Sequence, residues 1–184
     1  MKRRTISDVI FSVGVLSWDK NTLIDYKNCC NRYAIDAAPE FGQSYNWPYD
    51  FDGIKTSTDG VYIFMYTKLG TKGLLIKNGE LLREINRSYY YASTYDYPVE
   101  FYTNSAGRTF LLHCPFSYNK IDFEDVETGE IIGNKVDRIP SDFFHSRFEV
   151  SPNGKFLLSK GWIWHPMNAI SLSQFKSEVR KNMI

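Results

Sequence analysis

The chain carries few residues that could perform catalysis or hold a metal ion. Its histidines are His113, His145 and His165, and the adjacent cysteines Cys29 and Cys30 are the other soft ligands of note. No two of these residues have a ligand spacing such as Cys-x-x-Cys or His-x-x-x-His. We therefore expect no metal site and no cofactor.

A hydrolase triad is not indicated either. Asp142, His145 and Ser146 are too close in the chain to form a triad without an unusual loop, and no Gly-x-Ser-x-Gly elbow occurs. His113 lies in the apolar stretch RTFLLHC (108–114), where a hydrogen-bonded core histidine is the expected role. These patterns predict a protein without catalytic residues.

The elements that position these side chains are indicated by a repeat. Gly60, Gly107 and Gly154 are spaced by 47 residues, and each lies between a short polar turn and an apolar run. The corresponding segments read IKTSTDGVYIFMY (54–66), FYTNSAGRTFLLH (101–113) and FEVSPNGKFLLSK (148–160). A period of roughly 40 to 50 residues with several short strands per unit is typical of propeller blades.

The residues between these turns fit four short antiparallel strands per unit. In one unit the strand candidates are 98–104, 108–114, 120–126 and 130–135. In the preceding unit an Asn-Gly pair at 78–79 lies between two apolar runs, which is a strong hairpin signal because both residues accept positive φ. One unit is therefore one blade.

We predict a single all-β domain, a β-propeller-like array of about three to four four-stranded antiparallel blades. Residues 51–91, 98–135 and 145–175 are the repeat blades, residues 1–50 form a degenerate or partial blade, and residues 176–184 are a tail that is expected to be helical. Leu172, Phe175 and Val179 have the spacing of a short helix over residues 171–184. This is few blades for a closed ring, so we expect an open arc. Its exposed apolar end faces favour self-association or capping by a partner.

Two short segments resemble the WD-repeat and YVTN-like families of β-propellers. They are VSPNGKFLLS (150–159) and DVETGEII (125–132), and the resemblance extends over roughly residues 50 to 175. The Trp-Asp dipeptide of true WD repeats is absent at the expected positions. The segment 142–172 is also similar to a motif in uncharacterised bacterial propeller-like proteins, which are longer than this chain. The resemblance implies a shortened propeller and no particular activity.

Composition argues against nucleic-acid and membrane partners. The 22 basic residues are balanced by 21 acidic ones, so no basic field for phosphates is present. No apolar run approaches the roughly 20 residues that span a bilayer. The basic start at 2–4 is followed by Asp8 and by no signal-peptide cleavage pattern. Three cysteines make no disulfide framework, and we expect a cytoplasmic protein.

Strand alternation places the loops of each blade on two faces. The loops after first and third strands are short and polar, whereas those after second and fourth strands are long and aromatic. Aromatic side chains concentrate at recognition surfaces, although they can also plug the spaces between blades. The candidate binding residues are Trp47, Tyr90, Tyr95, Phe116, Tyr118, Phe144, His145, Trp162, Trp164 and His165.

Two functions fit an aromatic face. The first is a non-catalytic interaction module that recognises a protein partner, in the manner of an immunity protein or a chaperone. The alternative is a carbohydrate-binding or glycoside-acting protein, in which Trp162 and Trp164 stack on sugar rings beside Asp96 or Asp142. In either case we expect Arg147 to pair with a carboxylate such as Asp142, or with backbone carbonyls of a neighbouring blade.

Overall fold

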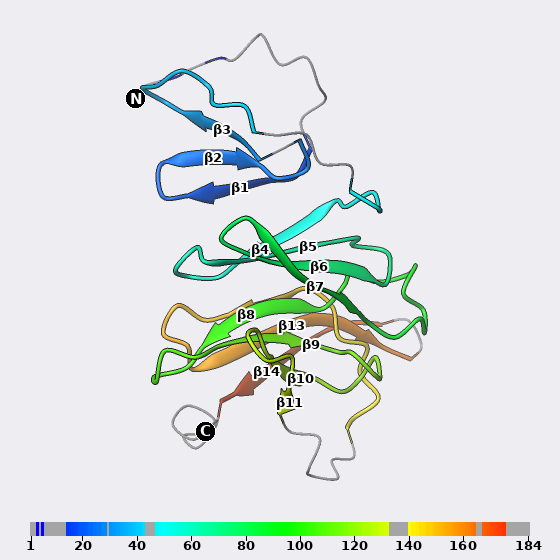
Figure 1. The fold of residues 1–184 in the computed structure, drawn as a ribbon. Helices are drawn as coiled ribbons and strands as arrows, with labels where there is room; N and C mark the ends of the chain where they lie inside the picture. The colour runs from blue at the N-terminus through cyan, green and yellow to red at the C-terminus, as the bar shows by residue number, and fades with distance from the viewer. Residues whose placement is uncertain are drawn as a thin grey trace.

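The computed structural model describes residues 3, 5, 14–28, 30–42, 47–132, 140–164 and 167–175. These residues form fourteen strands and no helix (Figure 1). The strands make four separate antiparallel sheets, each built from consecutive segments of the chain. Within the described ranges, no helix is long and apolar enough to cross a membrane.

The sheets follow one another along the chain. The first contains β1 (Leu16–Asp19), β2 (Thr22–Asp25) and β3 (Asn31–Ala34). The second contains β4 (Gly53–Thr56), β5 (Tyr62–Tyr66), β6 (Lys72–Lys77) and β7 (Glu80–Asn86). The third contains β8 (Val99–Thr103), β9 (Thr109–His113), β10 (Asp122–Asp125) and β11 (Ile131–Ile132). The fourth contains β12 (Phe148–Val150), β13 (Phe156–Ile163) and β14 (Met167–Gln174).

The first strand of each sheet lies on the inner side of an arc. Strand β1 contacts β4, β4 contacts β8, and β8 contacts β12, so the sheets are arranged in chain order. In Figure 1 the first sheet lies at the top, whereas the fourth overlaps the third sheet in the lower half, and no strand of the first sheet contacts a strand of the fourth among the described residues. The predicted all-β, propeller-like fold and its open arc are confirmed.

The repeat turns share one backbone geometry. Gly60, Gly107 and Gly154 have φ values of 76°, 80° and 62°. This left-handed conformation costs glycine little and other residues considerably more. Each glycine N–H donates to the carbonyl oxygen three residues earlier, over 2.9, 3.1 and 2.8 Å. The 47-residue spacing in the sequence therefore reports the same turn in three successive sheets.

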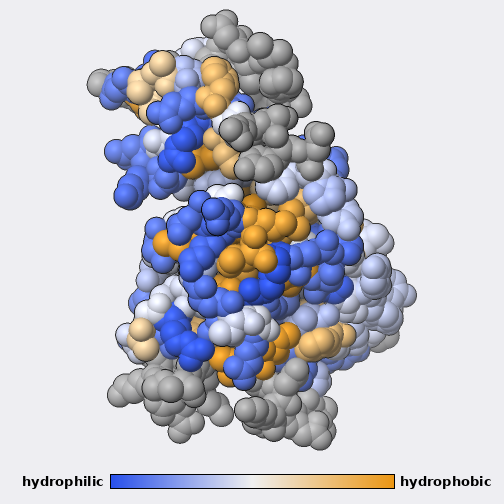
Figure 2. Space-filling model, in the orientation of Figure 1, coloured by the Kyte–Doolittle hydropathy of each residue, from blue (hydrophilic) through white to orange (hydrophobic). Residues whose placement is uncertain are grey.

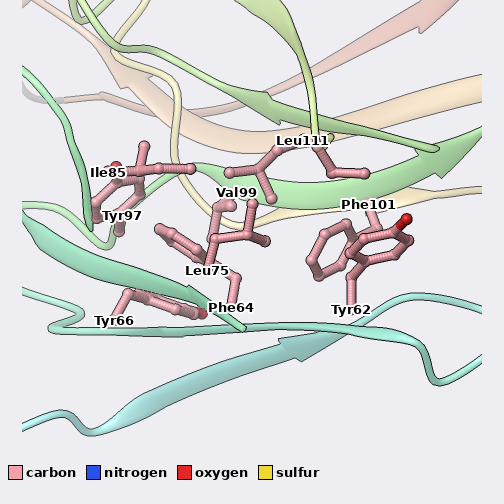
Figure 3. Packing of buried hydrophobic residues seen from close by; sticks show 10 residues of the cluster. Tyr62, Phe64, Tyr66, Leu75, Ile85, Tyr97, Val99, Phe101 and Leu111 are labelled. Carbon is pink, nitrogen blue, oxygen red and sulfur yellow. The ribbon is translucent and has the colours of Figure 1, made fainter. Parts of the chain in front are cut away.

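Each pair of neighbouring sheets encloses an apolar core. Figure 3 shows the core between the second and third sheets, where Phe64 and Leu75 face Val99 and Leu111. Gly73 has no side chain because the Phe64 ring already fills that position. Figure 2 shows hydrophobic residues in the middle of the molecule, flanked by hydrophilic ones. Burial of these rings and aliphatic chains stabilises the stack by about 25 cal/mol for each Å² of apolar surface removed from water.

One detail differs from the sequence-based prediction. Residues Ser171–Gln174 were expected to begin a short helix, but they belong to β14, whose backbone pairs with β13 along its whole length. The first sheet, expected as a degenerate or partial blade, has three described strands, and the fourth sheet, whose sequence shows no clear fourth strand, also has three. The predicted helical tail at 176–184 lies outside the described residues.

Candidate functional site

Phe144 is the centre of an aromatic cluster at one end of the strands. Its backbone pairs with Trp162 of β13: the Phe144 N–H donates to the Trp162 carbonyl oxygen over 2.8 Å, and the Trp162 N–H donates back over 3.2 Å. A Cβ on Gly161 would lie 2.0 Å from the Phe144 carbonyl oxygen. The absence of a side chain at Gly161 therefore permits this close pairing.

The Phe144 ring is fully buried between two parallel rings. Trp162 stacks on it with centroids 3.9 Å apart, and Tyr118 stacks on it at 4.0 Å. Edge contacts complete the packing. The cluster consists of Tyr90, Tyr91, Tyr95, Tyr118, Phe144, Trp162 and Trp164. We refer to these seven residues as the aromatic cluster.

A buried arginine holds one side of this cluster. Residues 87–98 connect β7 to β8 and supply three of its tyrosines. Arg87 is 2% exposed, donates to the carbonyl oxygens of Gly70, Lys68, Ala92 and Tyr95, and lies over the Tyr95 ring. Burial lowers the pKa of Arg87, although the guanidinium stays charged. The guanidinium of Arg87 therefore holds residues 87–98 in place by hydrogen bonds to their backbone carbonyl oxygens.

The cluster has a buried centre and an exposed rim. Phe144 and Tyr95 are buried, whereas Tyr90, Tyr91 and Trp164 are 46%, 45% and 43% exposed. The centre fills space between loops, as one reading of the sequence anticipated, and the rim offers ring faces to solvent. The cluster therefore contains both aromatic residues that fill space between segments and aromatic residues exposed for recognition, the two roles that the sequence left open.

A groove of about 650 Å³ adjoins the aromatic cluster. Its volume falls in the usual range for small-ligand sites, roughly 300 to 1,000 Å³. The lining residues include Tyr95 and Trp162 of the aromatic cluster, the cations Arg147 and Lys160, and the polar residues Ser146 and Asn168. The groove therefore combines an aromatic wall with two positive charges.

Both cations of this groove form ion pairs. Arg147 Nε is 3.0 Å from Asp96 Oδ2, and the Ser146 hydroxyl donates to the Asp96 backbone carbonyl oxygen over 3.1 Å. Arg147 has a φ of 41° and a side chain that is 68% exposed, so it can turn toward a ligand. Lys160 Nζ lies 3.4 Å from Glu149 in an exposed pair that contributes little stability.

Arg147 pairs with a carboxylate, as the sequence predicted, but with Asp96 and not with Asp142, the example named. Asp142 does not pair with it; the Asp142 carboxylate accepts a hydrogen bond from the Tyr118 hydroxyl over 2.6 Å. That hydrogen bond raises the pKa of Tyr118 to about 12. Asp96 takes the place of Asp142 because residues 87–98 fold back against the segment that leads into β12.

The remaining predicted binding residues lie elsewhere. His145 is buried beneath the cluster, 3.0 Å from the Ser159 hydroxyl, and burial lowers its pKa to about 4. Trp47 packs edge-on against Phe51, beside the second sheet. Phe116 is 63% exposed and is not one of the stacked rings. His165 lies outside the described residues.

His113 and Glu124 form a buried pair that is structural. His113 Nε2 is 3.0 Å from Glu124 Oε2, and Arg83 binds the other carboxylate oxygen. This confirms the expected core histidine. Among the described residues, no group of three or more His, Cys, Asp and Glu side chains is arranged to hold a metal ion.

The list of candidate binding residues missed several residues of the site, among them Arg87 and Lys160. Arg87 directly precedes the tyrosine-rich segment, and an arginine in that position could have been recognised from the sequence as a partner for the tyrosines. Lys160 could not be found this way, because its place in the groove depends on the length of the β13–β14 hairpin.

Comparison with known proteins shows the fold and no family. No protein-family model matches the sequence, and no curated protein sequence matches it. The resemblance to WD-repeat and YVTN-like families therefore stays a prediction. Similar solved structures are propeller-like proteins.

One of them is a putative 6-phosphogluconolactonase from Bacteroides uniformis, at a TM-score of 0.57 and 16% identity. The alignment covers 91% of this chain and 51% of that one, so the chain spans about half the length of its neighbour. A dihydro-heme d1 dehydrogenase matches at a TM-score of 0.50 and 14% identity, over 86% of this chain and 32% of the other. A virginiamycin B lyase from Staphylococcus aureus, solved with quinupristin, gives a TM-score of 0.48 and 12% identity, over 90% and 56%.

These neighbours correct the expected function. The sequence predicted a non-catalytic module that recognises a protein partner, yet the proteins of matching fold are named as enzymes. These neighbours share the fold at 16% and 14% identity, and the non-catalytic interpretation does not stand.

Proposed function

We propose that this chain is an enzyme that binds a small anionic sugar in the groove beside the aromatic cluster and hydrolyses its lactone ring. The observation that carries the proposal is the placement of Arg147 and Lys160 in one groove with Trp162. An aromatic ring and two cations are the groups that a phosphorylated sugar requires. The known neighbour named as a putative 6-phosphogluconolactonase supports this substrate class.

The aromatic side and the charged side of the groove would bind different parts of the substrate. The apolar face of a sugar ring stacks on an indole, and Trp162 supplies one at the edge of the groove. The phosphate would accept charge-assisted hydrogen bonds from Lys160, and Arg147 would face the lactone carbonyl and, in the product, the carboxylate. The Asn168 amide and the Ser146 hydroxyl would bind the sugar hydroxyls.

Asp96 is the candidate general base. Its carboxylate would take a proton from a water molecule whose oxygen attacks the lactone carbonyl carbon. The ring C–O bond then breaks, and the ring oxygen leaves with a proton as a hydroxyl group, giving the open sugar acid. Arg147, 3.0 Å from Asp96, is placed to stabilise the negative charge on the carbonyl oxygen during attack.

Lactone hydrolysis fits this groove better than glycoside hydrolysis. Glycosidases use two facing carboxyl groups. Asp96 borders the groove through its ion pair with the lining residue Arg147, whereas Asp142 accepts a hydrogen bond from Tyr118 and pairs with no lining residue. The two carboxylates considered for glycoside hydrolysis, Asp96 and Asp142, are therefore not brought together at this groove.

The test is hydrolysis of 6-phosphogluconolactone, followed by acid release, together with binding of the stable product 6-phosphogluconate. Asp96→Asn should abolish turnover and still bind the product. Lys160→Ala should weaken product binding by about tenfold, because a charge-assisted hydrogen bond contributes roughly 1.5 to 3 kcal/mol.

The matched control is Lys155→Ala, which removes an equally charged side chain from the distant turn before β13. It should leave both turnover and product binding unchanged. If wild-type protein neither hydrolyses the lactone above the spontaneous rate nor binds the product, the proposed function is wrong.

A further inference from the structure

We propose that two copies of this chain associate head to tail and close a ring, with the first sheet of each copy covering the fourth sheet of the other. The two sheets at the ends of the arc carry the interface. This inference rests on the fold and does not depend on the substrate proposed above.

The first sheet has an apolar face turned away from the rest of the molecule. The opposite face of this sheet points inward: Ile24 on that face is 2% exposed and packs in the core shared with the second sheet. Strand register places Trp18 opposite Leu23, and Leu23 opposite Tyr33, on the outward face. Trp18 is 61% exposed and Leu16, two residues earlier on the same face, is 41% exposed. A tryptophan this exposed on the edge strand β1, beside Leu16 on the same face, indicates an uncovered apolar surface.

The fourth sheet ends the arc in the same way. Phe148 and Leu157 face inward and pack in the core shared with the third sheet. The register places Leu158 opposite Leu172 and Lys160 opposite Ile170 on the outward face. Ile170 and Leu172 are 73% and 67% exposed.

The fold itself indicates what covers these faces. The chain aligns over 91% of its own length with only 51% of the neighbouring propeller-like lactonase structure, so one copy supplies about half of such an arrangement. Two copies of four sheets give eight, which lies within the usual range of about four to eight blades. A second copy is therefore the occupant with the right amount of structure.

Symmetry favours this arrangement over a contact between like ends. When the first sheet of one copy meets the fourth sheet of the other, the two-fold operation creates a second, identical contact. Both apolar faces of both copies are then buried, and no end remains to extend a polymer. A contact between like ends would leave one pair of apolar faces exposed.

Ring closure also affects the groove. Ile170 lies on the outward face of the fourth sheet and lines the groove as well, as does Lys160. The first sheet of the second copy would therefore border the groove on its open side. Association can be measured without any ligand, so its failure is distinct from failure of the proposed enzyme activity.

The experiment is sedimentation velocity of the full chain at micromolar concentration. Wild-type protein should sediment as a particle of twice the 21.4 kDa of one chain. Trp18→Asp and Ile170→Asp should each sediment as single copies while circular dichroism still shows β-structure. Leu69→Asp, which charges an equally exposed side chain away from both end sheets, should keep the two-copy mass.

Mixing the two variants tests the head-to-tail geometry. An equimolar mixture of Trp18→Asp and Ile170→Asp contains one intact pair of faces, so it should regain the two-copy mass with a weaker affinity. A wild-type monomer, a series of larger polymers, a two-copy particle in either variant alone, or no recovery on mixing would each overturn the proposal.

Discussion

The short turns at one end of the strands and the aromatic cluster at the other end are held by different interactions. At the turn end, backbone hydrogen bonds close each repeat turn, and ion pairs such as Arg108–Asp125 at 2.6 Å link neighbouring segments. At the aromatic end, stacked rings around Phe144 hold segments that are far apart in the chain. The turn end repeats from sheet to sheet, and the aromatic end does not.

This difference indicates that the turn end is the scaffold and the aromatic end is the site. The repeated turns position strands of similar length, and they need only local sequence to form. The aromatic end joins residues 87–98, the loop after β9 and the segment before β12, and the groove lies where these meet the β13–β14 hairpin. Variation in these longer segments can change the groove without disturbing the sheets.

The largest effect is expected at the centre of the cluster. Phe144→Ala should lower the free energy of unfolding by about 3 to 5 kcal/mol, because a fully buried ring and its two stacked partners are lost. Urea denaturation measures it. Phe116→Ala, at an exposed ring in the same region, should change stability by less than about 0.5 kcal/mol. Equal effects would show that the cluster is not a packed centre.

A second comparison uses the pH dependence of the free energy of unfolding. Burial lowers the pKa of His145 to about 4 from an ordinary value of 6.5. The unfolded chain binds a proton at His145 as pH falls through 6.5, while the folded chain does not. The contribution of His145 to the free energy of unfolding should therefore fall between pH 6.5 and about 4, by up to about 3 kcal/mol, and change no further below that pH. His145→Phe should flatten this part of the profile.

Asp125 gives the turn end a different pH dependence. Burial alone would raise the pKa of Asp125, but hydrogen bonds from the Thr128 backbone and from Arg108 outweigh it and hold the pKa below its usual 3.8. Its contribution is fully present above that value and is lost as pH falls through the lower folded-state pKa. Asp125→Asn should therefore leave the profile between pH 6.5 and 4 unchanged in shape. A flattened profile in that variant would contradict the assignment to His145.

Alanine substitutions at two glycines compare how much room the backbone leaves for a side chain at each end of the strands. At Gly161→Ala the new Cβ would lie 2.0 Å from the Phe144 carbonyl oxygen, so β13 and its partner must separate, at a cost of about 1 to 3 kcal/mol. At Gly107→Ala nothing lies within 4 Å, and the cost is the strain of a φ of 80°, about 1 to 2 kcal/mol. Tryptophan fluorescence should change in the folded state of Gly161→Ala and remain unchanged in Gly107→Ala. The reverse pattern would contradict the packing of Trp162 on Phe144.

The turn end could be predicted from the sequence, and most of the aromatic end could not. Gly60, Gly107 and Gly154 mark positive-φ turns that depend on a few adjacent residues. The aromatic residues were recognisable as a set, but the pairing of Arg147 with Asp96 depends on how two distant segments fold together. Residues 171–174 have helical spacing, yet pairing with β13 places them in a strand.

The smallest effect is expected at the exposed hydrogen bond between Tyr118 and Asp142. Asp142→Asn removes the charged acceptor that raises the pKa of Tyr118 to about 12, so that pKa should move toward 10. Stability should change by less than about 1 kcal/mol, because the pair is exposed. Ultraviolet titration of the tyrosines measures the shift. An unchanged titration curve would show that this hydrogen bond does not form in solution.

The central claim is that the aromatic end carries the ligand site and the turn end is scaffold. Amide hydrogen exchange with and without 6-phosphogluconate tests it most directly. The account predicts slower exchange on ligand binding at residues 94–95, 146–147, 160–162 and 168–170, which line the groove, and no change at the repeat turns 57–60, 104–107 and 151–154. Protection at the turns, or no protection anywhere at saturating ligand, would contradict it.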